Sequence, residues 1–407
     1  MRGARQLLTL RGPSGPRRGA ALQELSITPD GALLIVNGLI EDVGPSRRIE
    51  NLAAARGAQE VSAAGRIVMP AFVDSHTQVV FAHSGMGRGA PQPFSITQAV
   101  RHGARSMQSV TSRWLQAHAS SVIHGMLRHG TCSIEAKSGY GLDYTSEMKT
   151  LRAQAALNGK PIHIVSTFFG ASAVPAENEN NREAYLDYLR TEMLPTIARR
   201  KLSRFVDIRC DGEGFTVLQA RRYLEAARQL GFGLKLQLGD GPANHAVALA
   251  TELNAVAVKS SRYMPPPATE MLARSSTIVT LLPDSVFQTG KEPCYPARDL
   301  IDRGGIVALA SNFNPDTNPG YNMQAILSDA CRNLGLTAAE AISASTINGA
   351  HAIGSAQTVG SLEAGKQADL LLLNVCDYRD LPYYSGGNNV HLTMKRGAIV
   401  YKEGAIA

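Results

Sequence analysis

The sequence predicts an α/β protein: an eight-stranded parallel β/α barrel of the TIM type, with a small β-sandwich domain built from both chain ends. Three observations lead to this fold class. The chain has 407 residues, 44% of them hydrophobic, which is enough for one large barrel and a small appended domain. Through the middle of the chain, apolar runs with strand character alternate with helical stretches. Short strands with turn residues lie at both ends.

The small domain is expected to combine residues 1–65 with residues 355–407. Residues 32–36 and 39–43 are apolar runs joined at Asn37-Gly38, a dipeptide that suits the positive φ angles of a tight hairpin. Residues 369–373 and 398–401 have the same strand character, and glycines separate them. The segment between the two ends, residues 66–354, is expected to form the barrel.

The barrel is expected to begin with the apolar run at residues 67–74, where Phe72 and Val73 favour a buried strand. Seven further strands are expected, at residues 132–136, 162–168, 205–209, 234–238, 255–258, 278–282 and 306–310. Eight strands with intervening helices are what a closed β/α barrel requires. Active sites of such barrels lie at the carboxyl ends of the strands, so the polar residues that follow each strand are the functional candidates.

Composition argues against several classes of partner. The formal net charge is +7, but the basic residues form scattered pairs without aromatic interleaving, so nucleic-acid binding is not expected. No segment has the apolar length of a membrane span or a signal-peptide core. The five cysteines are odd in number and have no close pairs, which argues against a disulfide framework. We therefore expect a cytoplasmic protein with a small-molecule ligand, and neither nucleic acid nor membrane as a partner.

Six motifs identify the family that this sequence resembles. They are residues 69–76 (Met-Pro-Ala-Phe-Val-Asp-Ser-His), 137–143 (Lys-Ser-Gly-Tyr-Gly-Leu-Asp), 170–175 (Gly-Ala-Ser-Ala-Val-Pro), 312–315 (Asn-Phe-Asn-Pro), 365–370 (Gly-Lys-Gln-Ala-Asp-Leu) and 395–397 (Lys-Arg-Gly). The chain resembles imidazolonepropionase, a metal-dependent amidohydrolase that opens a cyclic amide C–N bond in histidine degradation. The resemblance implies a β/α barrel, an imidazole-like or cyclic amide ligand, and a homodimer.

The positions that hold the family's metal differ in this chain. The resemblance implies His-x-His after the first strand, a His after the fifth and an Asp after the eighth. His76, Gln78, Gln237 and Asn312 occupy those positions here. Neutral amides are poor ligands for a transition metal, which prefers imidazole, thiolate or carboxylate. We therefore expect no metal cofactor and no metal-dependent hydrolysis.

The expected substrate and catalytic residues also depart from the family pattern. The resemblance implies substrate-binding roles for Tyr140 and Asn314, and for Ser172 in place of a family His. Arg88 is a candidate for the family's substrate-binding Arg. The candidates for acid and base are Lys259, which replaces another family His, and Asp240, which stands where the family has a catalytic Glu.

Two hypotheses about function follow. In the first, the protein is a metal-independent enzyme that performs proton transfer, isomerisation or ring addition on an imidazole-like or cyclic amide molecule. In the second, it is an inactive homologue that binds a small molecule or regulates a partner. The direction of the Lys259 side chain matters for both hypotheses. Directed inward, its ammonium would supply positive charge and bind the amides of the former metal positions; directed outward, it would extend into solvent.

Overall fold

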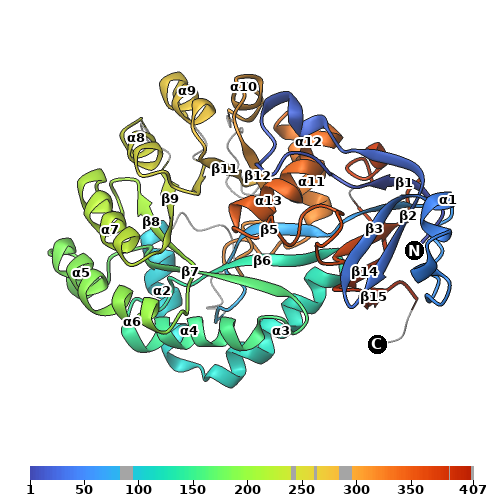
Figure 1. The fold of residues 1–407 in the computed structure, drawn as a ribbon. Coiled ribbons are helices and arrows are strands. Elements are labelled where there is room, and N and C mark those ends of the chain that lie inside the picture. Colours follow the sequence, from blue (N-terminus) through green and yellow to red (C-terminus); the bar gives the residue numbers. More distant parts are fainter. Residues whose placement is uncertain (83–94, 240–243, 261–263, 284–295, 385, 405–407) are drawn as a thin grey trace.

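The computed structural model describes residues 1–407 except 83–94, 240–243, 261–263, 284–295, 385 and 405–407 (Figure 1). Eight parallel strands follow one another in chain order around a nearly closed barrel. They are β5 (Phe72–Thr77), β6 (Thr131–Lys137), β7 (His163–Ala171), β8 (Phe205–Cys210), β9 (Gly233–Leu238), β10 (Ala257–Lys259), β11 (Ile278–Leu281) and β12 (Val307–Leu309). The predicted barrel is confirmed.

The first and last barrel strands approach each other at their carboxyl ends. Thr77 forms a parallel bridge with Phe313, and the Gln78 backbone N–H donates to the Phe313 carbonyl over 2.8 Å. This contact brings the segment after β12 beside the end of β5. The residues that follow the first and eighth strands therefore lie at one mouth, as the sequence predicted.

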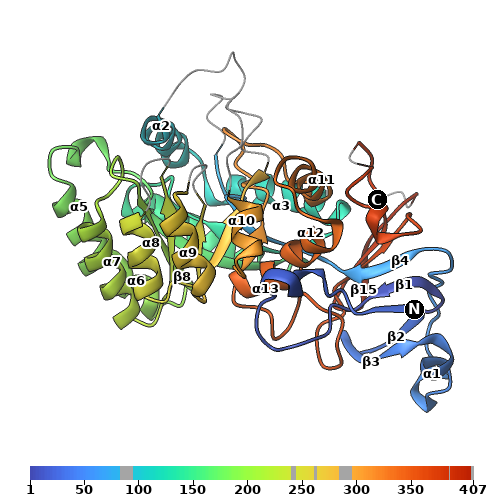
Figure 2. The same ribbon diagram turned by 90° about the horizontal axis from the view of Figure 1, so that it is seen from above.

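The helices surround the barrel (Figures 1 and 2). They are α2 (Ile96–Ser109), α3 (Ser112–Arg128), α4 (Tyr144–Leu157), α5 (Arg182–Tyr188), α6 (Leu194–Arg199), α7 (Val217–Gln229), α8 (Asn244–Glu252), α9 (Pro266–Arg274), α10 (Ala297–Asp302), α11 (Met323–Asn333), α12 (Ala338–Ser345) and α13 (Ile347–Ala352). Capping boxes fix several starts: Thr216 with Gln219 begins α7, and Thr337 with Glu340 begins α12.

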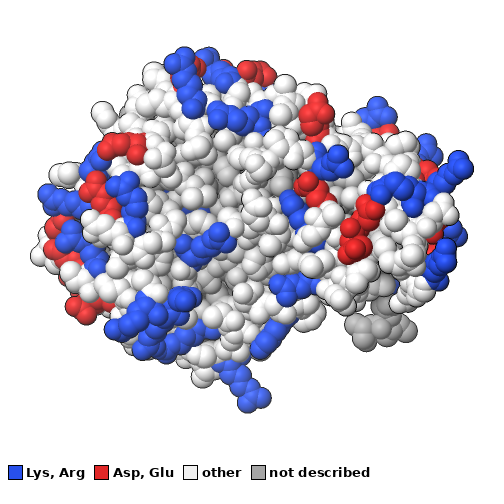
Figure 3. Space-filling view, viewed as in Figure 1, with Lys and Arg blue, Asp and Glu red and all other residues white. Residues whose placement is uncertain are grey.

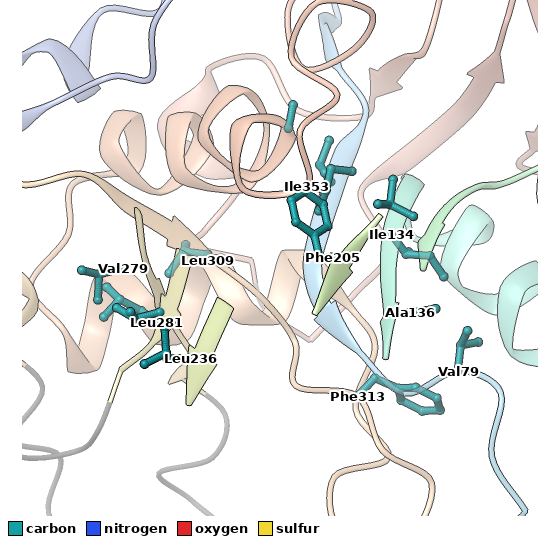
Figure 4. Close-up of a cluster of buried hydrophobic side chains, with 14 of the residues drawn as sticks. Val79, Ile134, Ala136, Phe205, Leu236, Val279, Leu281, Leu309, Phe313 and Ile353 are labelled. Atoms are coloured by element: carbon teal, nitrogen blue, oxygen red, sulfur yellow. The ribbon is translucent and has the colours of Figure 1, made fainter. Parts of the chain in front are cut away.

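The barrel strands alternate between an apolar outer face and a more polar inner face. Leu236 of β9, Val279 and Leu281 of β11, and Leu309 of β12 gather in the outer hydrophobic core (Figure 4). On β9 the intervening residues, Lys235 and Gln237, point to the other face. Strand geometry thus places every second side chain of these strands inside the barrel.

Strands from both chain ends come together as the fold class predicted, and they form one continuous mixed sheet of seven strands. Its order is β15 (Ala398–Lys402), β14 (Val390–Lys395), β13 (Leu370–Leu373), β4 (Ile67–Pro70), β1 (Ala4–Leu8), β2 (Ile27–Val36) and β3 (Leu39–Pro45). The short helix α1 (Ser46–Glu50) follows β3. Both termini lie at this end of the molecule (Figure 2).

The strand predicted at residues 67–74 is two strands in the structure. β4 pairs with β1 and β13 in the small sheet, whereas β5 pairs with β6 in the barrel. Pro70 has no backbone N–H to continue a ladder, and Ala71 donates its own N–H to the Asp369 carbonyl over 3.1 Å. The chain therefore changes sheets within one residue.

Surface charge, helix length and the state of the cysteines can be compared with the expectations from composition. On the face shown in Figure 3, basic side chains lie in several separate groups with acidic side chains among them. Among the described residues, no helix combines the length and apolar character needed to cross a bilayer. Cys132, Cys210, Cys331 and Cys376 are free thiols, and Cys294 lies outside the described residues.

The hairpin between β2 and β3 generates a stability prediction. Gly38 has a φ of 80°, and a Cβ there would lie 2.8 Å from the Arg396 carbonyl oxygen. Gly38→Ala should therefore lower the free energy of unfolding by about 1–3 kcal/mol, measured by urea denaturation. Gly57→Ala is the control, because a Cβ at Gly57 meets nothing within 4 Å. Equal losses in the two variants would contradict this account of the turn.

Candidate functional site

A network of four charged side chains lies inside the barrel. Glu135 and Lys137 come from β6, Asp207 from β8 and Lys235 from β9, and each side chain is at least 96% buried. Lys137 Nζ contacts Glu135 Oε1 at 3.0 Å and Asp207 Oδ2 at 2.8 Å, and Lys235 Nζ contacts Glu135 Oε1 at 2.7 Å. Two carboxylates and two ammonium groups thus balance one another in the barrel centre.

The network continues through neutral groups. Thr167 on β7 donates its hydroxyl to Glu135 Oε1. Gln237 Nε2 donates to Asp207 Oδ2 over 3.0 Å. The Lys235 ammonium also lies 4.6 Å from the centroid of the Phe205 ring, a cation–π distance. Four successive strands, β6 to β9, are therefore joined through their inward side chains.

Burial acts on the two lysines differently. For Lys137, burial alone would lower the pKa, but Asp207 and Glu135 together outweigh it and raise the pKa above its ordinary value. For Lys235, burial dominates; Glu135 opposes it and the neighbouring Lys137 charge adds to it, so the pKa falls to about 8. Lys137 is therefore a permanent cation near neutral pH, whereas Lys235 exchanges its proton just above it.

His76, the remaining imidazole among the family's metal positions, is buried close to these cations. Burial, followed by the charges of Lys137, Lys259 and Lys235, holds its pKa well below 6.5. The imidazole is consequently neutral at physiological pH. The Lys259 charge contributes to this lowering of the pKa, after burial and Lys137.

The other three ligand-equivalent positions hold amides, and two of these amides bind other side chains. The Gln78 side-chain oxygen accepts a hydrogen bond from Asn314 Nδ2, and Gln237 binds Asp207. Asn312 follows β12 in the left-handed region, with a φ of 57°. Among the described residues, no cluster of three or more His, Cys, Asp or Glu side chains has the arrangement of a metal site.

The Tyr140 ring packs against the ring of Phe81 beside these amides. Their ring centroids are 4.5 Å apart at an angle of 79°, an edge-to-face contact. Burial is the main cause that raises the pKa of Tyr140, and a hydrogen bond to Asn314 opposes the rise. Hydrogen bonds therefore join Asn314 to both Tyr140 and Gln78. Two predicted substrate-binding residues thus lie beside a ligand-equivalent position.

The remaining predicted residues have different outcomes. Ser172 is buried, and its hydroxyl donates to the Gly139 carbonyl over 2.5 Å, which ties β7 to the Lys137–Asp143 motif. Lys259 ends β10, with its Cα beside that of Gln237. Arg88 and Asp240 lie outside the described residues. Their proposed roles stay predictions.

Glu135, Asp207 and Lys235 are not among the functional residues predicted from the sequence. The signal was present in the alternation of Ser133-Ile134-Glu135-Ala136-Lys137 and Leu234-Lys235-Leu236-Gln237, where charged residues occupy every second position of an apolar strand. In a barrel this pattern places the charges inside rather than in solvent. Only pairing across strands, which sequence does not display, matches each charge with its partner.

Comparisons with known proteins bear on the whole chain. A model of the amidohydrolase family matches residues 247–400. The chain is 37% identical over 415 residues to the imidazolonepropionase of Symbiobacterium thermophilum. This alignment covers 99% of this chain and 97% of that protein. It is 36% identical over 411 residues to the imidazolonepropionase of Solibacter usitatus, with 98% of each chain covered.

Solved structures share the fold at much lower identity. A triazine hydrolase variant superposes with a TM-score of 0.77 at 15% identity, covering 98% of this chain and 94% of that one. The guanine deaminase of E. coli superposes with a TM-score of 0.73 at 16% identity, covering 99% of both chains. These matches confirm the architecture of a barrel with an appended sheet.

The charged network predicts a large cost for removing one member. In Lys137→Met, Glu135 and Asp207 lose a shared cation in a buried environment, so the free energy of unfolding should fall by about 3–5 kcal/mol in urea denaturation. Arg221→Met is the control, because Arg221 forms its ion pair with Glu252 at the protein surface and its loss should cost far less. Similar losses in both variants would show that the network is not balanced as described.

The lowered pKa of Lys235 predicts a specific pH dependence of stability. Between about pH 8 and pH 10.5, the unfolded chain holds a proton that the native Lys235 has released, so the free energy of unfolding rises with pH through this window. Below pH 8, Lys235 is protonated in both the native and the unfolded chain, so the cost of burying its ammonium lowers the free energy of unfolding in full. Relative to Lys235→Met, the wild type should gain on the order of 3 kcal/mol across the window.

Urea denaturation at a series of pH values measures this difference. The exposed Lys402 on β15 provides the control, since Lys402→Met should follow the wild-type pH profile. A wild-type curve parallel to that of Lys235→Met between pH 8 and 10.5 would contradict the assignment.

Proposed function

The chain belongs to the imidazolonepropionase family of amidohydrolases, and we propose that its barrel mouth acts on a small imidazole-like or cyclic amide molecule without a resident transition metal. The observation that carries this proposal is the set of side chains at the four ligand-equivalent positions, where one imidazole, that of His76, stands with three amides. Lys137, Lys235 and Lys259 all act on this imidazole, in the region where the family resemblance implies a metal.

The four ligand-equivalent positions do not fit such an ion. They offer one imidazole and three amides, a weak donor set for zinc. The amide oxygen of Gln78 already accepts a hydrogen bond from Asn314, so a metal ligated by this oxygen would compete with that bond. Some solved structures with this fold, such as an atrazine chlorohydrolase from Arthrobacter aurescens, are complexes with zinc, but that likeness concerns the fold.

The residues of the mouth suit a planar ring ligand. Tyr140, packed on Phe81, supplies an aromatic ring, and the side-chain amide of Gln78 supplies N–H donors for ring nitrogen and carbonyl groups. We propose that Lys259 provides the cation that polarises a ring carbonyl. This role needs no bound metal, because an ammonium can stabilise negative charge that develops on that oxygen.

Proton transfer is the reaction class best supported by the described side chains. A metal-free catalyst needs groups that exchange protons near neutral pH. Lys235 has a pKa lowered to about 8 by burial, and Asp74 has a pKa raised to about 6, chiefly by burial and against hydrogen bonds from Ser311 and His76. We propose that these two groups keep the interior able to donate and accept protons as the ring reacts at the mouth.

Binding without reaction is the second candidate function. It is favoured by hydrogen bonds and ion pairs that occupy the polar groups within the protein: Asp211 and Glu213 are paired with Arg209, and the Ser172 hydroxyl is bound to Gly139.

The experiment that separates the candidates measures both binding and turnover of imidazole-like and cyclic amide compounds, before and after chelator treatment. Chelator-insensitive turnover that is lost in Lys259→Met supports the enzyme; binding without turnover supports the second candidate. Turnover abolished by chelation and restored by zinc would overturn the metal-free proposal.

Metal content provides a direct prediction. Elemental analysis of the purified protein should find zinc far below one ion per chain, because amides replace the stronger ligands at three of four positions. Combining Gln78→His, Gln237→His and Asn312→Asp should produce stoichiometric zinc uptake. The control combines Gln78→Asn, Gln237→Asn and Asn312→Gln, which changes side-chain size but keeps amide chemistry, and it should bind no more zinc than the wild type. One tightly held zinc per wild-type chain would sink the prediction.

A further inference from the structure

Three buried polar atoms below the charged network have no hydrogen-bond partner in the described part of the chain. They are Glu135 Oε2, Ser133 Oγ and His163 Nδ1. The Glu135 and Ser133 side chains are almost completely buried, and His163 is partly exposed at the start of β7. A buried polar atom without a partner costs about 1–3 kcal/mol, so three in one region require a physical explanation.

Strand geometry places these atoms beside one another. Ser133 and Glu135 are two residues apart on β6 and therefore share its inner face. The Cα atom of Ser133 is in register with that of His163 on the neighbouring strand β7. Residues two apart on one strand are roughly 6.6 Å apart, which is too far for a direct hydrogen bond between short side chains. A hydrogen-bonded chain of one or two water molecules connects side chains at about this spacing.

Apolar side chains on the opposite side of the lower barrel offer these atoms no hydrogen-bond partner. That side is formed by a small apolar cluster of Ala257, Ile278, Ile306, Ala308 and Ala352. None of these side chains donates or accepts a hydrogen bond, and the three alanines occupy little volume. A site with several convergent polar atoms on one side and small apolar residues on the other is the kind that holds buried water.

We propose that the barrel interior below the charged network binds a short file of internal water molecules, held by Glu135 Oε2, Ser133 Oγ and His163 Nδ1. The waters supply donors to the second oxygen of Glu135, whose first oxygen already accepts from Lys137, Lys235 and Thr167. The file joins the network to His163 at the lower end of the barrel. It gives the network a hydrogen-bonded route to that end that does not pass through the mouth, and it does not depend on the proposed function.

The sign of a stability change tests this proposal. If waters bind Ser133, Ser133→Ala removes one of their partners and should lower the melting temperature. If the region is dry, the same variant removes an unsatisfied hydroxyl and should raise it. Ser343→Ala is the matched control, because Ser343 on α12 is also fully buried with an unpartnered Oγ but lies outside the barrel interior. A melting temperature that is unchanged or raised in Ser133→Ala, as expected for the control, overturns the proposal.

A second measurement does not rely on a variant. A high-resolution crystal structure of the wild type should show solvent density within hydrogen-bond distance of Glu135 Oε2 and Ser133 Oγ. In Ser133→Ala the density next to residue 133 should weaken or disappear, while the density at Glu135 remains. Absence of solvent density at both atoms in the wild type would reject the file.

Discussion

The balance of charge inside the barrel is the constraint on which the rest of the site depends. Removing an ion from water is costly, and a buried ion pair recovers that cost only when its geometry and additional hydrogen bonds are good. Glu135 meets this condition through Lys137, Lys235 and Thr167, and Asp207 through Lys137 and Gln237. The network therefore adds little stability overall, but it restricts the strands to one register, because a shift by one residue would turn every charge toward the outer core.

The same balance determines the electrostatics of the mouth. Lys137 and Lys235 neutralise Glu135 and Asp207, so the network itself adds little net charge to the mouth. His76 responds to the lysine charges around it and stays neutral. In the proposed function, the neutral imidazole, the three amides and Tyr140 would bind a ring through hydrogen bonds and surface contact.

Much of the fold was predictable because it depends on local pattern. Seven of the eight barrel strands are where their apolar runs indicated, and Asn37-Gly38 forms the expected hairpin. The division of residues 67–74 between two sheets was not predicted, since Pro70 ends one ladder only in the context of partners far away in sequence. For the site, positions at strand ends indicated His76, Gln78, Gln237, Asn312 and Lys259. The network beneath them was missed, because partners such as Glu135 and Lys235 are 100 residues apart.

The passage from β4 to β5 also affects how the protein is made. β4 lies between β1, near the first residue, and β13, which begins at Leu370, and one residue later the chain enters the strand that carries His76. On the ribosome, β1 and β4 emerge early, whereas β13 emerges only after almost the whole barrel has been synthesised. Until then one edge of β4, with Ile67, Val68 and Met69, has no partner. A nascent chain that pauses before Leu370 therefore exposes an apolar strand edge, and chaperone binding to this segment would protect it from aggregation until synthesis is complete.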